Sequence, residues 1–102
     1  MKIEILVIGR HPQILATLLR LINQNSDWKA TGTSDDEEAM EFFKQQSFDL
    51  VLLSSGIEEE SERKLRSYFA ALDSNATIIQ HYGGGSGLLT GEIFQALENR
   101  KK

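Results

Sequence analysis

Polar residues that can do chemistry follow three of the apolar runs in this sequence. Gly9 and Arg10 come directly after the first run, Ser54 and Ser55 come at the end of the third, and His81 comes at the end of the fourth. If these runs are parallel strands, their carboxyl ends meet at one edge of the sheet, where α/β proteins usually bind ligands. An arginine beside two hydroxyls at that edge suggests an anion as the ligand.

The simpler interpretation of Arg10 is an ion pair. The acidic residues Glu58 to Glu60 come soon after Ser54, and their carboxylates can neutralise a guanidinium at the protein surface. We favour this ion pair over an anion site. His11 and His81 can reach the same edge, but two histidines without a third ligand make a poor metal site, so the sequence predicts no bound metal.

A glycine-rich segment, Gly83 to Gly87, precedes the last helical stretch. Backbone N–H groups at the start of a helix can bind a phosphate. Gly84, Gly85 and Ser86 are therefore candidates for an anion site shared with Arg10 and the two serines. The segment lacks the lysine of a P-loop, however, and it follows the fourth apolar run instead of the first, where the dinucleotide-binding fingerprint occurs. The simpler interpretation is a connector.

The elements that must position these residues alternate along the chain. Four apolar runs are typical of strands, and four longer stretches repeat apolar residues at helical spacing. Pro12 suits the first residue of a helix, and Ser34 or Asp35 suits a helix cap. The expected strands are Ile3–Ile8, Trp28–Thr33, residues Leu50 to Leu53 within Ser47–Ser54, and Ala76–Tyr82. The expected helices begin at Pro12, after the cap at Ser34 or Asp35, at Glu58 and after Gly87.

This alternation predicts the fold class. Strands that alternate with helices of this length form βαβ units with right-handed crossovers. We predict a three-layer α/β/α sandwich with a four-stranded parallel sheet in the order 2-1-3-4. The residues expected to be fully buried in its core are Leu6, Ile8, Val51, Leu53 and Ile78.

Length and composition limit the class of protein. The 102 residues fit a single domain, residues 1–102. Fifteen acidic and 11 basic residues give a net charge of −4, which disfavours nucleic acid because phosphate binding needs a clustered basic face. The absence of cysteine excludes disulfides and thiolate chemistry. No apolar stretch has the length of a signal peptide or a membrane span, so we expect a cytoplasmic location and no membrane partner.

The series of elements resembles the receiver domain of two-component response regulators, which has a flavodoxin-like fold. Ile5–Ile8, followed by a three-residue turn and Pro12, is similar to the family's first strand and its acidic turn. The segment 34–39, SDDEEA, is similar to the "S-D-G-E-E-A" opening of the second helix. The segment 48–53, FDLVLL, is similar to the "P-D-L-V-L-L" third strand, which ends on the phosphorylated aspartate.

Four positions depart from that family. Gly9 and Arg10 stand where the family has the acidic pair that holds Mg²⁺, Ser54 stands where it has the phospho-accepting aspartate, and His81 stands at its switch Thr or Ser. Mg²⁺ prefers carboxylate oxygens, and Ser54 lacks the carboxylate nucleophile. The resemblance therefore implies a degenerate receiver that does not take up phosphate.

These departures favour a binding module over an enzyme. The leading interpretation is a non-phosphorylatable regulatory or protein-interaction module in two-component-type signalling, with a protein partner and no cofactor. The alternative is a small anion-binding or nucleotide-binding domain that uses Arg10, Ser54 and the Gly83–Gly87 segment. An ordered anion bridging these residues would favour the alternative.

The family's fifth strand has no counterpart between Tyr82 and the last helical stretch, which shortens the domain. The fourth strand would then be an exposed edge, and Thr77 to Gln80 carry neither a charge nor a proline to protect it. We therefore expect a homodimer formed by the fourth strand and the last helix. Ile79, Phe94 and Leu97 are expected near the contact.

Overall fold

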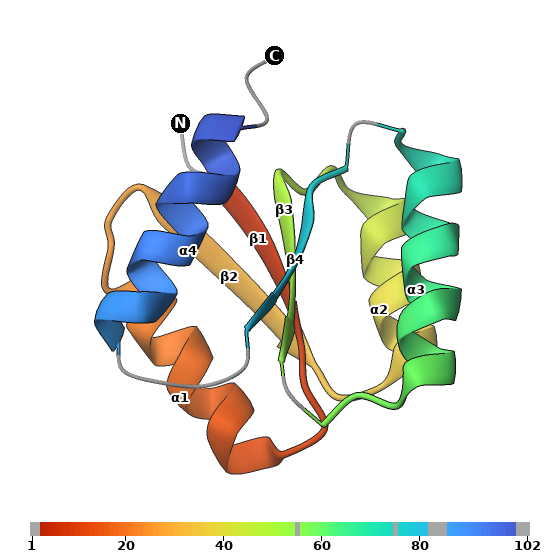
Figure 1. The fold of residues 1–102 in the computed structure, drawn as a ribbon, viewed down its shortest axis with the longest axis horizontal. Helices are drawn as coiled ribbons and strands as arrows, with labels where there is room; N and C mark the ends of the chain where they lie inside the picture. The colour runs from red at the N-terminus through yellow and green to blue at the C-terminus, as the bar shows by residue number, and fades with distance from the viewer. Residues whose placement is uncertain (1–2, 55, 75, 82–85, 100–102) are drawn as a thin grey trace.

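The computed structural model describes residues 3–54, 56–74, 76–81 and 86–99. Strands and helices alternate along the whole chain, as predicted (Figure 1). The elements are β1 (Ile3–Ile8), α1 (Pro12–Asn23), β2 (Trp28–Thr33), α2 (Asp36–Gln45), β3 (Leu50–Ser54), α3 (Glu59–Leu72), β4 (Ile78–His81) and α4 (Ser86–Asn99).

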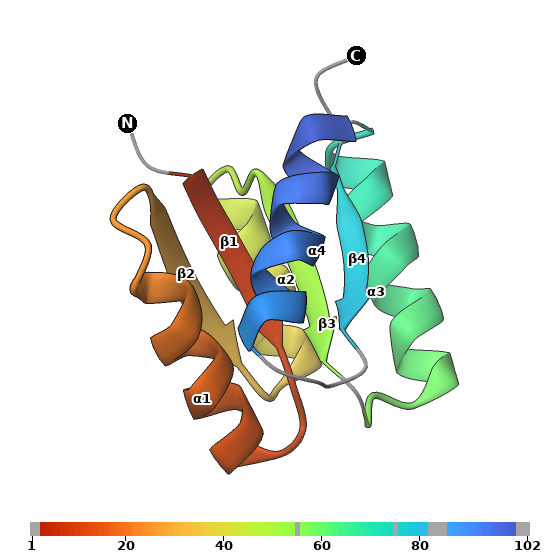
Figure 2. The ribbon, with the colours of Figure 1, turned by 60° about the vertical axis from the view of Figure 1, so that its left-hand side comes forward.

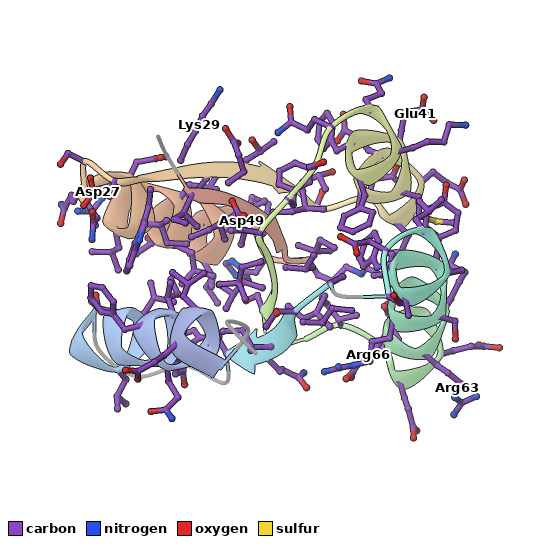
Figure 3. All side chains as sticks on the ribbon, turned by 90° about the horizontal axis from the view of Figure 1, so that it is seen from above. Asp27, Lys29, Glu41, Asp49, Arg63 and Arg66 are labelled. Atoms are coloured by element: carbon purple, nitrogen blue, oxygen red, sulfur yellow. The ribbon has the colours of Figure 1, made fainter. Side chains whose placement is uncertain are left out.

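The four strands form one parallel sheet in the order β2-β1-β3-β4, which confirms the predicted fold class. Helices α1 and α4 cover one face of the sheet, and α2 and α3 cover the other (Figures 1 and 2). Seen from above, the two pairs of helices lie on opposite sides of the strands (Figure 3). All four strands point the same way, so their carboxyl ends share one edge.

The two central strands carry the core. β1 and β3 are apolar on both faces because helices cover both, and successive residues enter opposite clusters. Of the five residues expected to be fully buried, four are buried: Leu6, Ile8, Val51 and Leu53. The expectation for Ile78 was wrong, because this residue is only partly buried. Its strand lies at the end of the sheet and has β3 as its single neighbour.

Local signals set most of the helix starts. Pro12 is the first residue of α1, and the side chain of Asp35 caps α2 by accepting the Glu38 N–H at 3.0 Å. Helix α3 begins at Glu59, one residue later than expected, with Glu58 as its cap residue but without a side-chain cap hydrogen bond. Helix α4 begins at Ser86, inside the segment expected to be a connector. Each helix follows a strand of the parallel sheet, so these starts lie at the carboxyl edge.

Candidate functional site

Arg10 joins three separate turns at the carboxyl edge of the sheet. It follows β1, and its guanidinium donates to the Asp36 carboxylate at the start of α2 (2.8 Å), to the Glu58 carboxylate before α3 (3.1 Å) and to the Ser34 carbonyl (3.0 Å). The ion pair with the acidic run at 58–60 is thereby confirmed through Glu58. The Asp36 partner was missed, although its place in the first turn of a helix at the same edge was a usable signal.

A second cation lies close to the Asp36 carboxylate. Lys64, on α3, places its Nζ 3.7 Å from Asp36 and 4.0 Å from Glu37. The Asp36 side chain is 11% exposed and that of Arg10 is 25% exposed, so this pair is partly shielded from water, whereas Glu58 is at the surface. Below, the Arg10 cluster means Arg10, Asp36, Glu58 and Lys64.

The electrostatics of the Arg10 cluster favour its charged state. Partial burial acts to raise the pKa of Asp36, but hydrogen bonds from Arg10 and Ser61 and the charges of Arg10 and Lys64 outweigh it, so that this pKa is lowered. The pKa of Glu58 is lowered by its own backbone N–H and by Arg10. Partial burial acts to lower the pKa of Arg10, yet the hydrogen bonds and charges of Asp36 and Glu58 raise it overall. Arg10, Asp36 and Glu58 therefore stay ionised at neutral pH.

Ser54 is buried at the end of β3, at the same edge of the sheet as Arg10. It is 2% exposed, and a Cβ atom placed on Gly9 would lie 3.1 Å from the Ser54 Cβ. Gly9 itself is buried, and its N–H donates to the Thr33 carbonyl at 3.1 Å. The two positions expected to correspond to an acidic residue and a phosphate acceptor are thus neighbours, and a side chain on Gly9 would crowd Ser54.

His81 lies beside Ser54 in the sheet register and is also buried. Its Nδ1 lies 2.6 Å from a carboxylate oxygen of Glu92, which connects the end of β4 to α4. The sequence did not indicate Glu92 as the partner of His81, because nothing in the helical pattern shows which side of α4 faces β4. His11 is exposed at the start of α1, and the described part of the chain holds no group of three or more residues suited to a metal ion.

The expected anion site can be followed only in part. Arg10 and Ser54 lie at the same edge, but Arg10 donates to two carboxylates, which would repel an anion. Ser55, Gly84 and Gly85 lie outside the described residues, as does most of the Gly83–Gly87 segment. Ser86 is described as the first residue of α4.

The fold of the chain is the receiver fold of two-component signalling proteins. A signal receiver domain of an HD domain-containing protein from Pseudomonas fluorescens Pf-5 superposes with a TM-score of 0.84, over 98% of both chains at 17% identity. A CheY-like response-regulator receiver domain protein from Methanospirillum hungatei JF-1 superposes with a TM-score of 0.82, over 99% of this chain and 98% of that one, at 11% identity.

A third structure of this fold contains a ligand. The response regulator TrrA from Thermotoga maritima, in complex with Mg(2+)-BeF, superposes with a TM-score of 0.72, over 98% of this chain and 99% of its own, at 21% identity. No family model and no curated protein matches the sequence. Among the described residues, no helix is both long enough and apolar enough to cross a membrane.

Arg10→Ala tests whether the Arg10 cluster stabilises the fold. We expect the free energy of unfolding to fall by about 1–2 kcal/mol at neutral pH. This is the usual contribution of a hydrogen bond between charged groups, reduced because Arg10 is partly exposed to water. A folded-state pKa below the unfolded value stabilises the protein above the unfolded pKa, and this contribution is lost as the pH falls through the folded pKa. The wild type should therefore lose stability as the pH falls below about 4, the ordinary pKa of these carboxyl groups, with a shallower loss in the variant.

Urea unfolding at several pH values measures both effects. Arg20→Ala is the matched control because Arg20 lies at an exposed position in the last turn of α1, and its effect should stay within about 0.5 kcal/mol. An equal effect of the two substitutions, or an unchanged acid limb in Arg10→Ala, would contradict a stabilising role for the cluster.

Proposed function

We propose that this protein is a receiver-like regulatory module that acts by binding another protein and does not accept a phosphoryl group. The observation that carries the proposal is the Arg10 cluster. The guanidinium of Arg10 forms ion pairs with the carboxylates of Asp36 and Glu58 at the edge of the sheet where receiver domains carry out their chemistry.

The residues at this edge do not suit phosphoryl transfer. Such a transfer needs a nucleophile and a metal or other cation to neutralise the developing charge on the phosphoryl oxygens. Mg²⁺ takes hard oxygen ligands, but Gly9 has no side chain and the position next to it is a cation. The β3 residue at this edge is a buried serine that packs against Gly9, with no carboxylate to form an acyl phosphate.

The Arg10 cluster instead performs a structural role. It connects the turns after β1, β2 and β3, which are the turns that ligands and metal ions would otherwise bridge. We infer that the module holds one arrangement of these turns without a chemical signal. Its output would then depend on which protein binds and on how much of the module is present.

Exposure to a phosphoryl donor tests the proposal. With acetyl phosphate and Mg²⁺, the intact protein should show no mass increase of one phosphoryl group, while a phosphorylatable receiver treated in parallel should. Mg²⁺ with beryllofluoride, the combination present in the Thermotoga TrrA structure, should leave the fluorescence of the single tryptophan, Trp28, unchanged. Stoichiometric labelling would refute the proposal.

Ser54→Asp provides a stricter version of the same experiment. It restores a carboxylate at the end of β3 but leaves Arg10 and Gly9 in place. We expect this variant also to remain unlabelled, because the guanidinium of Arg10 would still exclude the metal ion. Circular dichroism would show that the variant is folded. Labelling of folded Ser54→Asp would mean that the serine alone blocks the chemistry.

A further inference from the structure

The β4 strand is an open edge of the sheet. Its one neighbour is β3, and no strand of the described residues lies beyond it (Figure 2). Val51 donates its N–H to the Thr77 carbonyl at 2.8 Å and lies opposite Ile78 in the register. In a parallel pair the backbone groups of alternate residues face each neighbour, so the N–H and C=O of Ile78 face away from β3.

The two edges of the sheet are protected unequally. The other edge strand, β2, carries an exposed lysine, Lys29, which Figure 3 shows projecting outward. A lysine on an edge strand is a common defence against pairing with another chain. Residues Ile78 to Gln80 include no charge and no proline. The β4 edge is therefore the one that is able to pair.

A groove lies between this edge and the last helix. Its volume is about 540 Å³, and we call it the β4–α4 groove; its lining residues are Ile79, Gln80, Leu88, Gly91, Glu92, Gln95 and Ala96. Leu88 is 61% exposed, the highest value of any large apolar side chain described. A Cβ atom on Gly91 would meet nothing within 4 Å. Glycine inside a helix costs about 1 kcal/mol relative to alanine, and open space above it lets another backbone approach.

The distribution of charge identifies the occupant. Helix α4 contains two charged residues, Glu92 and Glu98, and Glu92 is paired with His81. Helix α3, of the same length, contains six, with Arg63 and Arg66 projecting outward in Figure 3. Two copies of a chain with a net charge of −4 repel each other through most of their surface. The almost uncharged β4–α4 face can meet its own copy without that penalty.

We propose that two copies pair their β4 edges antiparallel about a two-fold axis. The two sheets then join into one of eight strands, and Leu88 of each copy covers the groove of the other. A two-fold axis places the same patch on both sides of the contact, which suits an uncharged strand beside a groove whose one charged lining residue, Glu92, contacts His81. This assembly is independent of whether the protein accepts phosphate.

The contact that we propose differs in part from the one expected from the sequence. Of the three expected from the sequence, Ile79 lines the groove. Phe94 packs its ring 5.0 Å from that of Trp28, and Leu97 packs against the buried cluster under α1 and α4. The proposed contact therefore centres on Ile79, Leu88 and Gly91.

Sedimentation equilibrium from micromolar to submillimolar concentrations tests the assembly. The wild type should show a monomer–dimer equilibrium. Leu88→Lys and Gly91→Arg should each weaken it at least about tenfold, a loss of about 1.4 kcal/mol of association energy. Gly91→Arg replaces glycine with a better helix former, so a weaker dimer cannot be attributed to a weaker helix.

Leu72→Lys is the matched control, because Leu72 is a 49% exposed leucine on α3, on the other face of the sheet. It should leave dimerisation unchanged. A wild-type protein that stays monomeric at every concentration overturns the proposal. This holds also if its β4 edge binds an uncharged peptide, because the occupant is then another molecule and not a second copy of the chain. A dimer that resists both groove variants also overturns it.

Discussion

Leu53→Ala is expected to lower the free energy of unfolding by about 2–5 kcal/mol. Leu53 has no exposed surface, and it lies between Ile8 and Gln80 in the sheet register. Its side chain belongs to the buried cluster under α2 and α3. Truncation would remove apolar contacts and leave a cavity that a sheet fixed on both sides cannot close. For a domain of about this size, the melting temperature should fall by at least about 8 °C.

The measurement is reversible unfolding in urea, followed by the fluorescence of Trp28, which is buried in the folded protein. Leu72→Ala removes the same atoms from a side chain that is half exposed, and its cost should stay below about 1 kcal/mol. If the two substitutions cost the same, β3 is not the central strand of a packed core.

The central strands could be predicted because their burial is encoded in nearly continuous apolar runs. The sequence IEILVI and the sequence LVLLS leave little choice about where they lie. The edge strand was less well predicted. Ile78 is an apolar residue like those of the core, and its partial exposure follows from the number of strands beside it. That number is a property of the whole sheet, so a local pattern cannot reveal it.

The site shows the same division between local and global information. Topology alone placed Arg10, Ser54 and His81 at one edge, because parallel strands must end together. The choice between Glu58 and Asp36 as partners of Arg10 depends on how the turns at the carboxyl edge bend, and the arginine contacts both. The contact between His81 and Glu92 depends on the rotation of α4 about its axis. The sequence therefore predicts which edge of the sheet holds these residues, whereas the residues that pair with them depend on tertiary packing.

Phe69→Ala should lower the free energy of unfolding by about 3–5 kcal/mol. The Phe69 side chain is fully buried on α3, and its ring lies 4.5 Å from that of Phe43 on α2. Phe43 in turn stacks on Phe48, at 6.2 Å between ring centres. This row of rings joins the two helices of one layer to each other and to the sheet. Phe94→Ala makes the same deletion where the ring is 53% exposed, and should cost about 1 kcal/mol.

Combining Phe69→Ala with Arg10→Ala shows whether the packing of Phe69 fixes the position of α3 at the candidate site. Phe69 lies in the C-terminal half of α3, whereas Lys64 of the Arg10 cluster lies in its N-terminal half and Glu58 lies at its cap position. The two substitutions share no partner, so their costs should add within about 0.5 kcal/mol if α3 keeps its position when Phe69 is lost. A double variant that is more stable than the sum predicts would show that α3 shifts in Phe69→Ala and already separates Glu58 from Arg10. In that case the aromatic row, through α3, positions the Arg10 cluster.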